Sequence, residues 1–327
     1  TSGTSNFRAG VNAGNSIQSG GNYNVVVGDE AGTALTTGDN NTLLGYQTGD
    51  ALTTPFGNVA IGDRALSAET TGQRNTAVGS TALFAQNNTG NELVYNTAVG
   101  YQAGSAITTG IQNTILGALA GDALTTGKEQ IAIGYEALSA ETDGIASTAI
   151  GYQALKAQNG AGATNVYNVA VGYQAGSAIT TGIRNTIMGS EAGDALTDAD
   201  YNIAIGYQAL STDTQGSRSV AIGYQALEVQ NFTSATDSKN VAVGFNCGVA
   251  VSTGTLNTFM GYNAGASNTT GYDNICIGRD SGVTGSDAGG SGCVTGYRNI
   301  LIGQGGNLSA TDGIHQITLG SHITGAN

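Results

Sequence analysis

Acidic residues recur at fixed intervals along this chain of 327 residues, and carboxylates are the groups in it best suited to chemistry. One series is spaced by 72 residues: Asp50, Asp122 and Asp194. A second series follows it each time by 19 residues: Glu69, Glu141 and Asp213. Carboxylate oxygens bind Ca²⁺, so we weigh Ca²⁺ at the first series, between chains. We favour solvated surface charge for both series, because the Gly-Gly-x-Gly-x-Asp nonapeptide of calcium-binding rolls is absent.

Catalytic motifs are hard to place in this sequence. The only histidines are His315 and His322, and no nucleophile elbow, P-loop or zinc-ligand spacing is present. Two carboxyl groups suffice for glycoside hydrolysis, but such sites usually interrupt a repeat, whereas these carboxylates follow one. We therefore predict that the chain is not an enzyme and carries no cofactor.

Three cysteines, Cys247, Cys276 and Cys293, lie in the last third of the chain. An odd number is not a disulfide framework. A disulfide between Cys276 and Cys293 would pin the long insert, which we weigh as a hypothesis, and Cys247 is interpreted as a small core residue.

An internal repeat must position all these residues. The pattern Asn-x-x-x-Gly recurs mostly at steps of 17 residues, and the step order 17, 17, 17, 21 sums to 72. Blocks of four units begin at Asn24, Asn96, Asn168 and Asn240, and the fourth block has its long unit third. The repeat predicts an array over residues 24–315. A degenerate first coil and cap fill residues 1–23, and residues 316–327 are the last coil and the C-terminal end.

Each unit, numbered from its Asn, reads as one turn of a stacked structure. Position 2 is β-branched, position 3 is usually Ala and position 4 is Val, Ile, Leu or Met, an alternation typical of a strand. Positions 11 and 12 indicate a second, weaker strand. A 17-residue unit cannot bury a core alone, so the sequence predicts an all-β, parallel β-solenoid of about 18 coils with an Asn ladder at position 1.

Position 5 is Gly in all of these units, which indicates a backbone angle or a close approach that a Cβ would block. Examples are Gly28, Gly45, Gly62, Gly100, Gly172 and Gly244. Position 9 reads Gly, Gly, Leu, Leu in the first three blocks, and position 3 is enlarged only in the second unit of a block, as in Leu43 and Phe259. We predict that the large side chain fills the space beside the glycines, so that the 72-residue period preserves packing.

Four segments depart from the template: residues 84–95, 156–167, 228–239 and 279–298. Loops on a rigid scaffold can vary without harming the core, so we predict that they contact a ligand. The candidate contact residues are Phe84, Tyr95, Lys156, Tyr167, Phe232, Lys239, Arg279, Tyr297 and Arg298. Tyr also recurs at position 6, which we interpret as a structural ladder rather than a sugar-stacking stripe, because it follows the repeat.

The charge of the chain narrows its partners. The net charge is −13, which disfavours nucleic acid and anionic membrane surfaces. No stretch approaches the roughly 20 apolar residues of a membrane-spanning helix, so we expect no membrane insertion. Each coil carries only a few sizeable apolar residues, which is thin for a single chain, and we expect a homotrimer around a shared core.

The phrases "NTAVGYQA", "NVAIGDRAL" and "NVAVGYQAG" resemble the head repeats of trimeric autotransporter adhesins, and more closely the repeat arrays of bacteriophage tail fibres. "HQITLGSHITGAN", residues 315–327, is similar to the segment that precedes a self-cleaving chaperone domain in such fibres. The resemblance covers about residues 6–320 and implies a trimeric, left-handed parallel β-roll. Adhesin heads have shorter units and are followed by a stalk and a membrane anchor, which this sequence lacks, so the tail-fibre resemblance is favoured.

The sequence therefore predicts the structural and adhesive shaft of an extracellular fibre, in a virion tail fibre or at a cell surface, that binds a host-surface glycan or protein receptor. The alternative is a bacterial cell-surface adhesin or filament subunit. A glycan-depolymerising tailspike and an ice-binding solenoid with Thr-Thr hydroxyl rows are less favoured.

Overall fold

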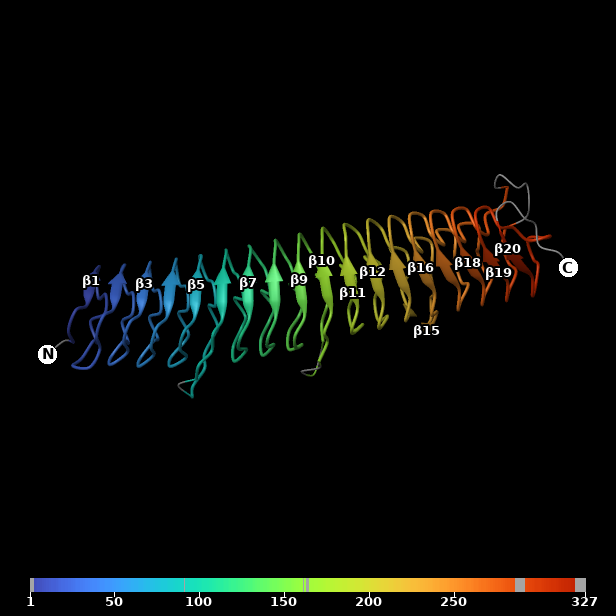
Figure 1. Cartoon of the computed structure of the whole chain (residues 1–327). Coiled ribbons are helices and arrows are strands. Elements are labelled where there is room, and N and C mark those ends of the chain that lie inside the picture. The colour runs from blue at the N-terminus through green and yellow to red at the C-terminus, as the bar shows by residue number, and fades with distance from the viewer. Residues whose placement is uncertain (1–2, 91, 161, 163–164, 286–291, 321–327) are drawn as a thin grey trace. The chain divides into compact units, whose positions relative to one another are not determined.

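The computed structural model describes residues 3–90, 92–160, 162, 165–285 and 292–320. Within these residues the regular elements are all strands, and no helix is present that could cross a membrane. The chain divides into two compact units, Thr1–Tyr167 and Asn168–Asn327, so the array is split where its third block begins. Each unit is a parallel β-solenoid (Figure 1), and the chain has about 18 coils.

The first unit stacks nine strands of three residues, one from each coil. They are β1 (Phe7–Ala9), β2 (Val25–Val27), β3 (Thr42–Leu44), β4 (Val59–Ile61), β5 (Thr76–Val78), β6 (Thr97–Val99), β7 (Thr114–Leu116), β8 (Ile131–Ile133) and β9 (Thr148–Ile150). Each pairs in parallel with the same positions of the next coil. Because β1 pairs with β2 in the same register, residues 7–9 form the strand of the first coil.

The second unit repeats the arrangement with nine more such strands. They are β10 (Val169–Val171), β11 (Thr186–Met188), β12 (Ile203–Ile205), β14 (Val220–Ile222), β16 (Val241–Val243), β17 (Thr258–Met260), β18 (Ile275–Ile277), β19 (Ile300–Ile302) and β20 (Ile317–Leu319). They too pair in parallel and in register. A separate parallel pair joins β13 (Gly216–Ser217) to β15 (Thr236–Asp237).

The core of each coil is built from position 3 of its strand. From β2 onward this residue in the three-residue strands is at most 2% exposed, whether it is Ala60 or Phe259. The apolar residues at positions 2 and 4 face outward, and Leu116 and Met188 are 45% and 44% exposed. The sequence alternates as a strand does. However, position 3, which is usually Ala, points inward, and the larger residues at positions 2 and 4 point outward.

The predicted requirement for Gly at position 5 is confirmed on both counts. These glycines have φ between 119° and 144°, a region that L side chains rarely adopt. A Cβ on Gly28 would lie 2.2 Å from the carbonyl oxygen of Gly45 in the next coil, and the other predicted structural glycines meet the same obstacle at 2.3–2.6 Å.

The Asn ladder is also confirmed. The Oδ1 of each position-1 Asn accepts the backbone N–H of the next, as in Asn96 to Asn113 (2.9 Å), and the pattern holds at Asn168 and Asn240. The Nδ2 of Asn96 donates to the carbonyl of Gly110 at 2.8 Å. Because the ladder is fully buried, each amide satisfies a backbone group that water cannot reach.

The packing within a block follows the predicted code. Phe259 carbons lie 2.9 Å and 2.6 Å from where a Cβ would sit on Gly248 and Gly265, and Leu43 occupies the same space beside Gly32 and Gly49. The two glycines therefore make room for one large side chain of the second coil.

The second strand predicted at positions 11 and 12 does not form. The N–H of Leu35, at position 12, donates to the carbonyl of Gly32 within its own turn (3.1 Å), so it is not available to a neighbouring coil. The coils are bonded on either side of Leu35, where the N–H of Ala34 donates to Asp50 at 3.0 Å and that of Thr36 to Thr53 at 2.8 Å.

Candidate functional site

The four inserts are narrower in the structure than their predicted limits. In the first, the N–H of Asn87 still pairs with Thr108 of the next coil (2.9 Å), and the N–H of Val94 donates to Gln73 of the preceding coil (3.2 Å). The departure therefore begins at residue 88 and ends before Leu93, which forms a parallel bridge with Gln73. The insert of the fourth block leaves its coil at a different corner, between Gly282, which is bonded to Gly306, and Cys293.

The third insert builds the best-defined site. Its return segment forms β15, which pairs with β13 of the preceding coil in the register Ser217↔Asp237. This pair borders an open cavity of about 280 Å³. The lining residues are Asp198, Asp200, Tyr201, Ser217, Arg218, Ala235, Thr236 and Asp237.

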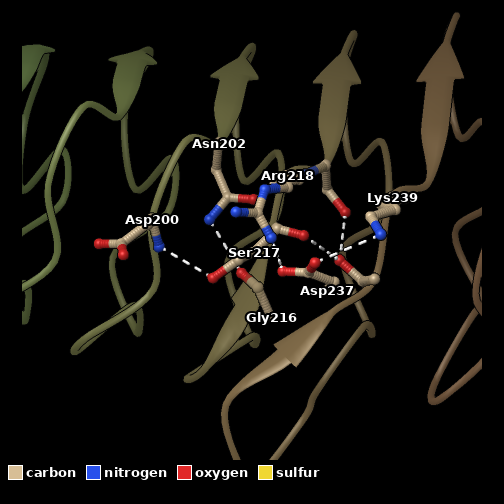
Figure 2. A network of polar contacts seen from close by, with 9 residues as sticks. Asp200, Asn202, Gly216, Ser217, Arg218, Asp237 and Lys239 are labelled. Carbon is tan, nitrogen blue, oxygen red and sulfur yellow. Dashed lines mark hydrogen bonds and ion pairs between the residues drawn. The ribbon is translucent and has the colours of Figure 1, made fainter.

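A polar network organises this cavity (Figure 2). Arg218 and Lys239 both point toward Asp237; Arg218 forms a close ion pair with it, and the Lys239 Nζ lies 3.3 Å from its Oδ2. Burial alone would raise the pKa of Asp237, but its bonds to Lys239 and Arg218 and their charges hold the pKa below its usual range. At the opposite side, the N–H of Asp200 donates to the Ser217 hydroxyl at 3.0 Å.

Tyr201, which lines the cavity, makes cation–π contacts with two arginines. The guanidinium groups of Arg184 and Arg218 lie 5.4 Å and 5.5 Å from the Tyr201 ring centroid, and Arg184 Nη1 donates to the Tyr201 hydroxyl at 2.5 Å. A cation–π contact at an exposed site stabilises by about 0.5–1 kcal/mol. The arrangement offers hydroxyl, carboxylate and guanidinium groups to a polar ligand of about sugar size.

The residues that the repeat scaffold contributes to this site were missed by the sequence reasoning, and they include Asp198, Asp200 and Ser217. Arg184, Tyr201 and Arg218 occupy the last position of three successive units, so each looked like an ordinary member of the repeat. Their 17-residue spacing was the available signal, because residues one unit apart stack on each other in a solenoid.

The predicted contact residues are not brought together at one site. Of those in the third insert, Lys239 reaches the network, but Phe232 is only 8% exposed and packs beneath the turn at Gly216. Phe232 is therefore corrected from a contact residue to a core residue, because its ring fills the base of the insert.

The remaining contact candidates lie at or near the surface and are held locally. In the first unit, Phe84 and Tyr95 lie near Arg64 and Arg74 at 5.9 Å and 5.6 Å, Lys156 pairs with Glu136 at 2.5 Å, and Tyr167 is exposed. In the second unit, Arg279 pairs with Asp280 and Arg298 with Asp273, each at 3.5 Å, and Tyr297 stacks on Tyr272 at 4.7 Å.

The first carboxylate series is not fully solvated. Asp50, Asp122 and Asp194 each have a buried Oδ1 with no hydrogen-bond partner among the described residues. Burial raises the pKa of all three, that of Asp194 to about 6. Within the described residues no three His, Cys, Asp or Glu side chains converge as a metal site, and Ca²⁺ binding stays a prediction.

The second carboxylate series overturns the prediction of surface charge. Glu69, Glu141 and Asp213 are completely buried, at the position where the first two coils of the same blocks carry Leu or Ile. They satisfy their oxygens with N–H groups of the turn that follows them.

The tyrosine ladder and Cys247, a buried core residue, fit their structural interpretations, whereas the disulfide between Cys276 and Cys293 does not form. Tyr207, Tyr224, Phe245 and Tyr262 stack in sequence with centroid distances of 4.7–5.5 Å. All three cysteines are buried and unbonded, and the Sγ atoms of Cys276 and Cys293 are 3.9 Å apart, so the proposed pinning disulfide is not formed in this structure.

No protein-family model and no curated protein matches this chain.

Proposed function

We propose that this chain is the structural and adhesive shaft of an extracellular fibre, assembled from three copies, that presents its inserts to a receptor on a host surface, as a bacteriophage tail fibre does. A cell-surface adhesin would use the same scaffold in the same way.

The observation that carries this proposal is the outward apolar row on each unit. Position 4 of the strands places Val, Ile, Leu or Met on the outward face in coil after coil, and position 2 adds Val, Ile or Thr. Leu44, Leu116, Met188 and Met260, all at position 4, are 44–47% exposed. Contiguous exposed apolar surface on a soluble protein marks an interface. A second copy of the chain presents the same residues at the same coil spacing, so the rows match along their length.

The charge distribution supports the same assembly. From β2 to β20, the three-residue strands carry no charged side chain, although the whole chain has a net charge of −13. Copies can therefore approach through the strand face without bringing carboxylates together.

Attachment is assigned to the inserts, with the cavity beside β13 and β15 as the leading site. A stiff array holds weak contacts in register, and three copies multiply them through avidity. The receptor class is a host-surface glycan or protein that offers hydroxyl and amide groups to Asp200, Arg218 and Asp237.

The test is binding of the fluorescently labelled chain to a panel of bacterial cells and immobilised surface polysaccharides. We expect binding to some panel members, and a loss of at least about tenfold when Tyr201→Ala and Lys239→Ala are combined. The control is Tyr46→Ala, at a ladder position outside the inserts, which should bind normally. Absence of binding to every panel member, or unchanged binding after all four inserts are replaced by Thr-Thr-Gly turns, would contradict the proposal.

A further inference from the structure

The three buried carboxylates of the second series share one geometry, and that geometry involves the inserts. Glu69 Oε1 accepts the N–H groups of Thr70, Thr71 and Gly72 at 2.9, 3.1 and 2.7 Å. Successive N–H groups of a turn form a concave anion site. In this way the carboxylate closes the turn of its own coil, the third of the block.

The same carboxylate also holds the next coil at the residue where the insert begins. Glu69 accepts the N–H of Asn88 at 3.1 Å, Glu141 that of Gly160 at 3.0 Å, and Asp213 that of Phe232 at 3.0 Å. All three donors are at position 14 of the fourth coil. The anchored residue is thus the first one that departs from the 17-residue template.

A glutamine in the fourth coil completes the arrangement. Gln86, Gln158 and Gln230 donate Nε2 to Glu69, Glu141 and Asp213 at 2.9, 2.8 and 2.5 Å. The Oε1 of Gln86 accepts from Asn96 Nδ2, and that of Gln230 from Asn240 Nδ2, both at 2.8 Å. Because these two Asn residues open the next block, the pair ties three consecutive coils together around the insert.

The occurrence of the pair in the chain follows the inserts. In the first two coils of the first three blocks, which have no insert, position 12 is apolar, as at Leu35 and Leu52. The fourth block has no four-residue insert in its fourth coil, and there the two positions are Cys293 and Ala310. A buried carboxylate without a cation is costly, so its restriction to the coil that directly precedes an insert-bearing coil requires a compensating role.

We propose that each acid–glutamine pair is a clasp that fixes the base of the adjacent insert, and that Glu69, Glu141 and Asp213 are positioning residues for the display loops. In the third insert, the clasp at Asp213 fixes Phe232 and so sets the path of the segment that returns as β15 to the cavity. The effect on presentation rests on the proposed function, whereas the clasp itself rests on the fold alone.

A double-mutant cycle in the full chain tests the clasp. One change replaces the clasp by the leucine pair that insert-free coils use, Glu69→Leu with Gln86→Leu. The other replaces residues 87–93 by Thr-Thr-Gly, which restores the 17-residue template. We expect the leucine pair to lower the Tm when the insert is present and to raise it when the insert is absent. A change of the same sign in both backgrounds would overturn the proposal.

Amide hydrogen exchange locates the effect. With the insert present, the leucine pair should speed exchange at residues 88–90 and 92–93 by at least about tenfold, and leave β5 unchanged. If exchange rose equally in β5, Glu69 would stabilise the fold in general and would not position the insert. If the double variant does not fold, the isosteric Glu69→Gln, which faces Gln86 donor to donor, should show the same local pattern at about threefold or more. Neither readout involves a receptor, so this proposal can fail without the attachment function failing.

Discussion

Asn268 is a polar residue at a core position. It is fully buried, and neither its Oδ1 nor its Nδ2 has a hydrogen-bond partner among the described residues. The other three blocks carry Leu at the equivalent position: Leu52, Leu124 and Leu196. An unsatisfied buried polar group costs about 1–3 kcal/mol.

Asn268→Leu should therefore raise the free energy of unfolding by about 1–3 kcal/mol, read from the midpoint of urea denaturation. The matched control is Asn257→Leu. Asn257 donates to Asn240 and Gly271 at 3.2 Å and 2.8 Å, so that change should destabilise the protein. A lower midpoint for Asn268→Leu would show that its amide has a role that this structure does not explain.

Asp194 gives the protein a pH dependence with a definite sign. Burial, together with the nearby Glu191, raises the pKa of Asp194 to about 6 from an unperturbed 3.8. The native state therefore binds this proton more tightly than the unfolded state does. The resulting contribution of Asp194 to the free energy of unfolding is fully present below about pH 3.8 and is lost as the pH rises through about 6.

Asp194→Asn should accordingly raise the Tm at pH 8 by about 2–4 °C, since an uncharged amide is less costly to bury, and have little effect at pH 4. Thermal denaturation at both values is the measurement, and Asp198→Asn on the exposed surface of the same turn is the control. If Asp194→Asn changed the Tm equally at pH 4 and pH 8, desolvation of the carboxylate would not be the cause of the change.

At the scale of the element, each coil is defined by backbone constraints as much as by its core. Gly62 has φ 133°, and an added Cβ would meet the backbone of Gly79 at 2.6 Å. Gly57, five residues earlier, also has a positive φ, of 73°, but its Cβ would lie 3.9 Å from its nearest neighbour.

Gly62→Ala should destabilise the first unit by about 3 kcal/mol or more, because strain and a backbone clash coincide. Gly57→Asn should be nearly neutral, since Asn40 adopts φ 57° at the same position of the preceding coil. Denaturant midpoints of the two variants provide the comparison. Comparable losses would mean that the close approach between coils is not what fixes position 5.

These elements differ in how far the sequence reveals them. The strands, the position-5 glycines and the Asn ladder could be predicted because one physical constraint acts in every coil and therefore repeats in the letters. Glu69 and Phe232 could not, because their environments come from a turn and from a neighbouring coil. From sequence alone, a charged residue is expected at the surface and an aromatic residue in a loop is expected to contact a ligand. Glu69 and Phe232 are instead buried, so both expectations are wrong.

The candidate cavity shows the same limit. Lys239 was found because it lies within the predicted limits of the third insert, whereas Tyr201 and Arg218 lie in units without an insert and gain their role only when β15 pairs beside β13. Residues in an insert can be found because the insert interrupts the repeat. Residues that the regular coils contribute to the same site can be found only by asking which positions stack on one another.

At the scale of the whole molecule, the central claim is that three copies share the apolar strand faces. A partner of the same coil spacing would cover half-exposed residues such as Leu116 and Met260, and burial of apolar area stabilises by about 25 cal/mol per Å². Replacement of outward residues by Lys on several coils should then separate the copies before it unfolds the coils.

The most direct test is the mass of the native particle, measured by light scattering coupled to size exclusion over a range of concentrations. We expect a particle of three times the chain mass of 32.5 kDa, which persists on dilution. A particle of 32.5 kDa at all concentrations would contradict it, because the outward apolar rows would then be exposed in the functional protein.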